Sequence, residues 1–220
     1  MDLGVTIFLT DQSIDPVTLA REVECRGFSS LWLPEHTHIP TSRRTPAPMG
    51  EPLNEEYRRC LDPFVAMGMI AAVTENLRIG TGIALLAERD PIVTAKEVAT
   101  LDHCTGGRVS LGVGYGWNIE ELEDHGGSKA TRRAVVRERV LAMQNLWGDE
   151  VASFDGDHVH LAPSWAWPKP VQQVRGRTGV PVLVGGAPGP LLFQHIAEFG
   201  DGWIPVGGTG VAAAMADLRA

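Results

Sequence analysis

Short, nearly continuous apolar runs alternate along the chain with longer stretches in which apolar residues recur at helical spacing. The short runs predict strands that are buried on both faces. These predicted strands are residues 3–9, 30–33, 77–86, 108–114, 180–184 and 202–205. The longer stretches predict helices at residues 14–27, 62–75, 90–104, 131–147, 189–199 and 211–220.

Asp-Pro pairs stand at the beginning of three predicted helices. An aspartate at this place can cap the free N–H groups of the first turn, and proline is tolerated at the first helical position.

Two segments lie outside the alternation of strands and helices. Residues 37–61 are rich in proline and lack periodicity, which predicts a long loop beside an active site. Residues 151–162 predict a hairpin within an insertion at residues 150–180.

Strands that alternate with helices predict an α/β fold with a parallel sheet. A dinucleotide-binding fold would concentrate its glycines in the first turn, whereas here glycines follow several strands. This distribution favours a TIM barrel, whose site is built from many loops. Only six strands are predicted, while a closed barrel needs eight. We therefore expect one TIM-barrel-like domain over residues 1–220, shortened either natively or by the absence of its last part.

The composition and charge of the chain limit the classes of partner that we expect it to bind. The chain has 220 residues, of which 44% are hydrophobic and 21% charged, enough for an ordinary core. The net charge of −8, without a basic run, argues against a nucleic-acid partner. The longest uncharged apolar run, residues 64–73, is about half of a membrane span. The N-terminus lacks the basic region of a secretory signal, so no membrane partner is expected.

Three cysteines give a further constraint. Cys25, Cys60 and Cys104 are odd in number, far apart and without a CxxC pair. This pattern predicts neither a disulfide framework nor a metal site, and it favours a cytoplasmic location. We interpret all three as buried small hydrophobic residues.

Six stretches, in this order, resemble the bacterial luciferase-like superfamily, and more closely its branch of coenzyme F-420 (deazaflavin) dependent oxidoreductases. They are WLPEHTHIP, LDPFVAM, LRIGTGIALLAERDPIVTAKEVATLD, GGRVSLGVGYGWNIEELEDHG, LVGG and GDGWIP. The resemblance implies a luciferase-like barrel whose last two units are absent here. It also implies a flavin-type cofactor and a homodimer, and the open strand edges of a partial barrel would give a reason for dimerisation.

Glu35 and His36 directly follow the second predicted strand, at the mouth of the expected barrel. An imidazole there could exchange a proton during hydride transfer. In the family, the matching histidine lies beside the cofactor ring. We therefore predict catalytic roles for His36 and Glu35, and a solvated loop position for His38.

Glycines interrupt the strand at residues 77–86, which indicates a bulge or a close backbone approach. The resemblance implies a bulge with a non-proline cis peptide bond between Gly82 and Ile83, pressed against the back of the cofactor ring. Thr81, Gly82 and Ile83 are therefore predicted to bind the cofactor.

The glycine-rich segment at residues 112–118 is not a phosphate loop of the Walker type, because no Gly-Lys-Ser/Thr follows. Its glycines would let a ligand approach the backbone, and we predict that Gly114 and Tyr115 contact the cofactor. By the resemblance, Tyr115 replaces an arginine that binds the FMN phosphate in bacterial luciferases. This replacement argues for the deazaflavin over FMN, and it also removes an acidic proton donor that some deazaflavin enzymes have there.

A phosphate site is predicted from two further segments. The glycines at residues 185–186 join a strand to a helix, where free N–H groups and the helix dipole favour an anion. In the family these positions and the arginine matching Arg133 meet the cofactor phosphate. Arg132 is interpreted as a solvated side chain. The predicted phosphate contacts are Arg133, Gly185, Gly186 and Ala187.

The sequence thus predicts an oxidoreductase that transfers a hydride between coenzyme F-420 and an unknown small organic substrate. Two alternatives stay open. One is an FMN-dependent monooxygenase of the same superfamily. The other is a non-catalytic flavin-binding barrel that has lost turnover together with its last units.

Overall fold

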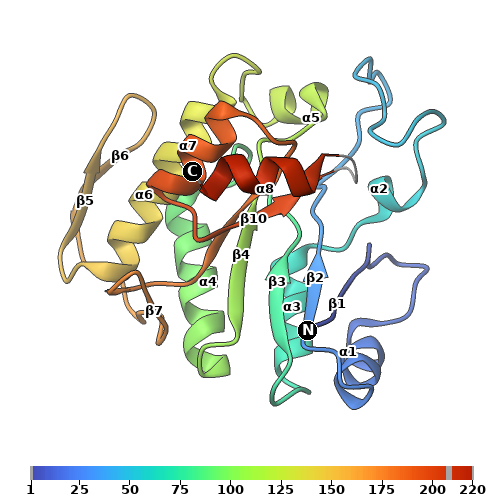
Figure 1. Cartoon of the computed structure of the whole chain (residues 1–220), viewed down its shortest axis with the longest axis horizontal. Helices are drawn as coiled ribbons and strands as arrows, with labels where there is room; N and C mark the ends of the chain where they lie inside the picture. Colours follow the sequence, from blue (N-terminus) through green and yellow to red (C-terminus); the bar gives the residue numbers. More distant parts are fainter. Residues whose placement is uncertain (1, 207–209, 220) are drawn as a thin grey trace.

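Six parallel strands form one sheet in the computed structural model, which describes residues 2–206 and 210–219 (Figure 1). The strands lie side by side in the sheet in the same order in which they occur along the chain. At least one helix separates each strand from the next. The strands in that order are β1 (Gly4–Thr6), β2 (Ser30–Leu33), β3 (Arg78–Thr81), β4 (Val109–Val113), β9 (Val182–Gly186) and β10 (Gly202–Pro205).

Helices cover one side of this sheet, and neighbouring helices pack against one another along it (Figure 1). The longest, α6, packs on α4, and Trp147 of α6 is 1% exposed with its indole N–H donating to the carbonyl of Ala95. The helices are α1 (Pro16–Cys25), α2 (Glu56–Arg59), α3 (Pro63–Ala71), α4 (Pro91–Thr105), α5 (Ile119–Asp124), α6 (Arg132–Gly148), α7 (Pro190–Glu198) and α8 (Val211–Arg219).

The parallel α/β prediction is confirmed, including all six strands of the main sheet. β1 and β10 lie at opposite edges of the sheet, so the described residues form part of a barrel wall rather than a closed ring. The expected homodimer stays a prediction. No helix within residues 2–206 and 210–219 has the length and apolar character that crossing a membrane requires.

The connection between β4 and β9 carries two small antiparallel hairpins. The predicted hairpin is present as β5 (Ala152–Asp155) and β6 (His160–Ser164), at the far left of Figure 1. A second hairpin, β7 (Gln173–Val174) and β8 (Arg177–Thr178), was not predicted because its strands are only two residues long. The short helices α2 and α5 were not predicted either, and Ala220 of the last predicted helix lies outside the described residues.

The prediction that all three cysteines are buried is wrong. Cys25 is the last residue of α1 and Cys104 lies in the last turn of α4, and both are exposed. Cys60 is partly buried beside the carbonyl of Pro34.

Aspartate caps explain where three helices begin. Asp15, Asp62 and Asp90 each accept a hydrogen bond from a backbone N–H of the first turn, and each is followed by a proline. Asp90 Oδ1 accepts from two such groups, of Ile92 and Val93, both at 2.9 Å. The cap places the start of α4 directly after the segment that follows β3.

Replacing Asp90 with alanine should lower the free energy of unfolding by about 1 kcal/mol, because two N–H groups lose their acceptor. Urea denaturation monitored by circular dichroism measures this change. Asp90→Asn keeps an acceptor oxygen and should stay within about 0.5 kcal/mol of the parent. Equal stability of the alanine and asparagine variants would show that the cap does not contribute.

Candidate active site

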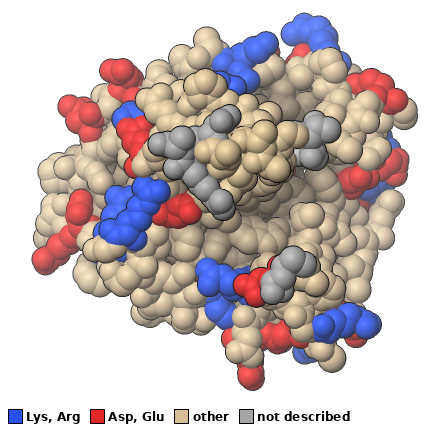
Figure 2. All heavy atoms as spheres, viewed as in Figure 1, with Lys and Arg blue, Asp and Glu red and all other residues tan. Residues whose placement is uncertain are grey.

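A cavity of about 420 Å³ lies where the carboxyl ends of β2, β3, β4 and β9 meet. Figure 2 shows a hollow on this face of the molecule, and most of the atoms around it belong to uncharged residues. The volume is in the range of small-molecule sites. Apart from Thr81, every predicted site residue lines the cavity: Glu35, His36, Gly82, Ile83, Gly114, Tyr115, Arg133, Gly185, Gly186 and Ala187.

Ile83 forms part of the cavity wall because the end of β3 leaves the sheet. Regular pairing stops at Thr81, and a single bridge between Ala84 and Val113 follows. The peptide bond between Gly82 and Ile83 is cis, as the resemblance implied. Thr81 itself is fully buried, and its hydroxyl donates to the carbonyl of Gly112 at 2.7 Å. Thr81 therefore joins β3 to β4 behind the cavity.

Two glycines make room for the Ile83 side chain. A Cβ atom on Gly114 would lie 2.4 Å from Cδ1 of Ile83, and one on Gly185 would lie 2.6 Å from its Cγ2. Both distances are far below van der Waals contact. The glycines that the sequence marked as ligand contacts therefore also have a packing reason, which is to seat an apolar side chain at the bottom of the cavity.

His36 directs one ring nitrogen to a buried carboxylate and the other to an indole. Its Nδ1 lies 2.7 Å from Oε2 of Glu121, and Nε1 of Trp117 donates to its Nε2 at 3.2 Å. Indole N–H can only donate, so Nε2 holds the lone pair and Nδ1 carries the hydrogen. Nε2 is therefore a proton acceptor at the cavity.

Glu35 turns away from His36 and secures the segment after β3. One oxygen accepts from the backbone N–H of Leu85 at 2.7 Å, and the other accepts from Nε of Arg89 at 2.5 Å. Burial raises the pKa of Glu35, against the opposing charge of Arg89. Because both oxygens are occupied, the geometry supports a positioning function, and the catalytic role of Glu35 stays a prediction.

The helix α5 holds the long loop with three carboxylates that the sequence analysis did not single out. Glu121 accepts from the backbone N–H of Thr37, and Asp124 Oδ2 lies 3.0 Å from Nε2 of His38. Glu120 accepts from the hydroxyl of Thr45 at 2.7 Å, and this bond with neighbouring backbone N–H groups lowers the pKa of Glu120 to about 2. The cue in the sequence was the acidic stretch from Glu120 to Asp124.

Aromatic rings line the cavity on the side of His36. The ring of Tyr57 lies 5.2 Å from that of His36 and 5.8 Å from that of Trp117, and 4.8 Å from the ring of Phe8. Tyr57 belongs to α2, inside the loop at residues 37–61. Residues 37–61 show no periodicity that would place this tyrosine, so the aromatic contacts were not predicted.

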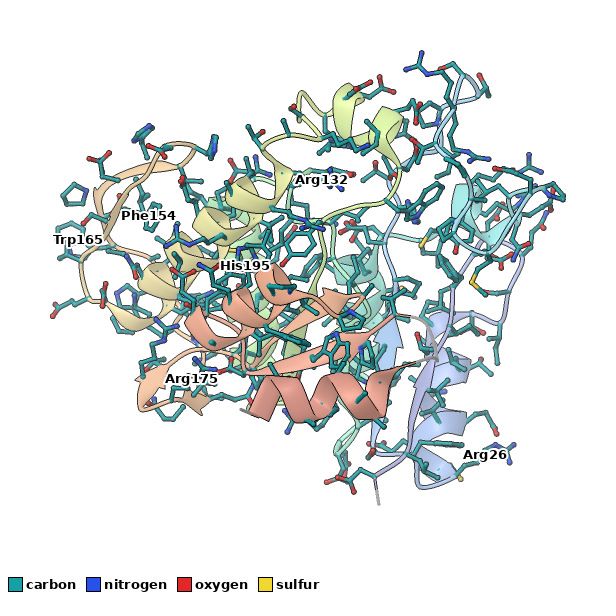
Figure 3. The ribbon with its side chains drawn as sticks, turned by 45° about the horizontal axis from the view of Figure 1, so that its top comes forward. Arg26, Arg132, Phe154, Trp165, Arg175 and His195 are labelled. Atoms are coloured by element: carbon teal, nitrogen blue, oxygen red, sulfur yellow. The ribbon has the colours of Figure 1, made fainter. Side chains whose placement is uncertain are left out.

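Two arginines from the start of α6 line the cavity, and Figure 1 shows α6 and α2 toward opposite edges of the sheet. The guanidinium of Arg133 stacks 5.2 Å above the ring of Tyr115, whose hydroxyl lies 2.7 Å from Nδ1 of His195. Arg132 points away from the start of α6 (Figure 3), and its buried Nε atom has no hydrogen-bond partner among the described residues. The interpretation of Arg132 as a solvated side chain is therefore wrong.

The junction of β9 and α7 extends the cavity. A neighbouring cavity of about 260 Å³ shares Tyr115, Arg133, Gly186 and Ala187 with the first and continues to the beginning of α7. Arginine side chains and the free backbone N–H groups near a helix start are both ligands for phosphate. The structure thus brings the predicted phosphate contacts together.

Glu88 is buried beneath the loop that follows β4. Its side chain is 1% exposed, and neither carboxylate oxygen has a hydrogen-bond partner in the described part of the chain. Burial, with the nearby charges of Glu121 and Glu35, raises its pKa to about 8. Glu88 therefore carries its proton at neutral pH.

Replacing Gly185 with alanine should destabilise the protein by about 1–3 kcal/mol, because the new methyl group collides with Ile83. Truncating the neighbour removes this conflict, since the Cβ of Ile83 would lie 3.6 Å away. In a double-mutant cycle by urea denaturation, Gly185→Ala should therefore cost much less in the Ile83→Ala background. An equal cost in both backgrounds would rule out the steric explanation.

Replacing Glu88 with glutamine should flatten the pH dependence of stability. The unfolded chain releases this proton near pH 4.5 and the folded chain near pH 8. Between these values the folded state binds more protons, so the free energy of unfolding falls by up to about 1.4 kcal/mol per pH unit. Thermal denaturation from pH 5 to 8 tests this, with the exposed Glu123→Gln as control. Parallel profiles of stability against pH for the parent and the Glu88→Gln variant would contradict this prediction.

The chain matches the family model of luciferase-like monooxygenases over residues 12–220. An uncharacterized protein of Mycobacterium tuberculosis is 46% identical over 207 residues, which cover 93% of this chain and 72% of that protein. The F420-dependent glucose-6-phosphate dehydrogenase of Kineococcus radiotolerans is 27% identical over 195 residues, or 87% of this chain and 52% of that enzyme.

Solved structures show the same fold. The monooxygenase RslO1 from Streptomyces bottropensis matches with a TM-score of 0.81 at 24% identity, over 99% of this chain and 63% of that one. An F420-dependent secondary alcohol dehydrogenase, solved with an F420-acetone adduct, matches with a TM-score of 0.76 at 22% identity, over 99% and 63%. The chain thus spans less than two thirds of these structures. The family model and the relative at 46% identity show that the chain belongs to the luciferase-like monooxygenase family.

Proposed function

We propose that this chain is an oxidoreductase that transfers a hydride between coenzyme F-420 and a small organic substrate. The observation that carries the proposal is the unprotonated Nε2 of His36, which stands in one cavity with an apolar floor at Ile83 and a pair of arginines. A hydride donor that also loses a proton needs such a base. A flavin-type cofactor with an anionic group needs an apolar surface for its ring, here Ile83, and cations for its negative charge, here the arginines.

The residues of the cavity fit a deazaflavin. Ile83, seated on Gly114 and Gly185, offers an apolar surface for the face of a planar ring. Arg133 and the backbone at Gly186 would hold the phosphate, and the cavity that continues to α7 leaves room for the cofactor tail. Arg132 lines the same cavity and gives one more cation for an anionic group.

The protein's own groups would position the substrate and move its proton. The deazaflavin, when bound, supplies the two-electron acceptor or donor. His36 Nε2 would take the proton of a substrate hydroxyl during oxidation, or return it to a carbonyl oxygen during reduction. Glu121 orients the imidazole ring through Nδ1, and the indole of Trp117 holds Nε2 until a substrate hydroxyl takes its place.

The rings of Phe8, Tyr57 and Trp117 favour a small and mainly apolar substrate with one hydroxyl or carbonyl group. The cationic side chains that line the cavity, Arg132 and Arg133, come from α6 and not from the elements that carry these rings, so an anionic group on the substrate would lack a partner beside the rings. The similarity to a secondary alcohol dehydrogenase is consistent with this substrate class.

An FMN-dependent monooxygenase is the second candidate. The structural similarity to a monooxygenase and the description of the family favour it. The position of Tyr115 argues against it, because a phenol whose pKa is raised by burial carries no charge for the FMN phosphate.

Fluorescence titration distinguishes the two cofactors and tests the site. We expect micromolar binding of coenzyme F-420 and weaker binding of FMN. Arg133→Ala should weaken F-420 binding about tenfold or more, because it removes a charge-assisted contact to phosphate. Arg26→Ala, at the exposed end of α1 far from the cavity (Figure 3), is the matched control and should leave binding unchanged.

Tighter binding of FMN, with oxygen consumption by the reduced complex, would overturn the deazaflavin proposal in favour of the monooxygenase. Tight F-420 binding without reduction of the cofactor by any of a panel of secondary alcohols would favour the non-catalytic alternative.

A further inference from the structure

A continuous row of polar side chains leads from His36 to the molecular surface. Beside the cavity, Glu121 is 1% exposed and lies 2.7 Å from Nδ1 of His36 through its Oε2 atom. Its other oxygen, Oε1, accepts from the backbone N–H of Thr37 at 2.9 Å and from the Thr37 hydroxyl at 3.4 Å. The carboxylate thus connects the imidazole with a hydroxyl group further out.

The Thr37 hydroxyl in turn reaches two exposed imidazoles. Its Oγ1 atom lies 2.9 Å from Nδ1 of His38 and 2.8 Å from Nε2 of His125. The side chain of His38 is 42% exposed, and its Nε2 lies 3.0 Å from Oδ2 of Asp124, which is 60% exposed. The row therefore ends in groups that exchange protons directly with water.

We propose that Glu121, Thr37 and His38 form a proton relay that joins His36 to solvent. The inference rests on the proposed function, in which His36 gains or loses one proton per turnover. A ligand that fills the cavity covers Nε2 and excludes water from it. While the ligand is bound, a protonated His36 can therefore lose a proton only through Nδ1, on the side of Glu121.

Every proton is accounted for when an alcohol loses a hydride to the deazaflavin. The substrate hydroxyl displaces the indole of Trp117 from Nε2 of His36. Its O–H bond then breaks as the proton binds Nε2, and the Nδ1–H proton passes to Oε2 of Glu121. Rotation about the Cγ–Cδ bond of Glu121 brings this proton to Thr37. The hydroxyl of Thr37 accepts it and releases its own proton to Nδ1 of His38, and His38 returns one to water. When the product has left, Nε2 gives its proton to water in the open cavity and Nδ1 takes one back along the row, which restores the first tautomer. Reduction of a carbonyl runs the same steps in reverse.

The neighbouring ionisable groups leave His38 and His125 as the outward routes. Glu35 is held by Arg89 and the backbone of Leu85, so it has no free oxygen for Thr37. Glu88, whose Oε2 lies 3.9 Å from Nε2 of His125, is buried and gives no route to solvent. His125 itself is exposed, so it gives a second and parallel exit beside His38.

The test is the solvent exchange rate of the His36 Nδ1 proton, measured by NMR on the full chain labelled with ¹⁵N-histidine. The measurement uses the protein without cofactor or substrate, and the loss of one resonance in His36→Asn assigns the signal. Thr37→Val should slow the exchange by about tenfold or more, because it removes the only hydroxyl in the row. Thr37→Ser keeps the hydroxyl and should exchange within about twofold of the parent.

A purely structural role of Thr37 would predict equal exchange in the valine and serine variants, and that result would overturn the relay. Should Thr37→Val disturb the fold, the variant lacking both exposed exits, His38→Ala with His125→Ala, carries the same test. It should also slow the exchange, and an unchanged rate would overturn the proposal. Failure of F-420 binding would instead overturn the proposed function and leave this measurement intact.

Discussion

The contact between His36 and Glu121 joins two segments 85 residues apart, and the candidate site depends on it. A buried carboxylate needs a partner, and removing one member of such a pair leaves an uncompensated charge. The imidazole supplies that partner, and in return the carboxylate fixes its tautomer. The same helix holds the first part of the long loop through Glu120 and Asp124. One short helix thus orients the proton acceptor and positions the loop residues next to it.

Three buried glutamates near this contact meet the cost of burial in three different ways. Glu35 has a guanidinium and a backbone N–H, and Glu121 has an imidazole and a backbone N–H. Glu88 has no partner among the described residues, and it keeps its proton instead. Arg89 is the cation in contact with Glu35. An ionised Glu88 would add a third negative charge beside Glu35 and Glu121, which would raise the electrostatic energy of all three carboxylates. Because Glu88 is neutral, it does not repel the Glu121 carboxylate that holds His36.

The alternation of apolar runs and amphipathic stretches was sufficient to predict the six parallel strands, because strands covered on both faces leave a strong signal. It could not predict α2 and α5, which are too short for periodicity and are stabilised by contacts to distant segments. For the site, the resemblance to the family, now confirmed, led to His36 and to the cis peptide bond before Ile83. Local sequence could not show that Glu121 lies behind His36, or that Arg132 reaches the cavity, since both depend on how the loops fold over the strand ends.

The layout of the cavity separates two kinds of recognition. The cavity's arginines lie on the side of α6 and α7 together with Tyr115, whereas Phe8, Tyr57, Trp117 and the proton acceptor lie on the side of α2 and α5. An anionic heterocycle can therefore bind in one direction, with its charged end toward Arg133. The space left near His36 is bounded by Tyr57, which belongs to the loop that α5 holds. A change in that loop would alter the space beside His36 and the environment of the acceptor together, while Arg133 and Gly186, the proposed cofactor contacts, come from other elements.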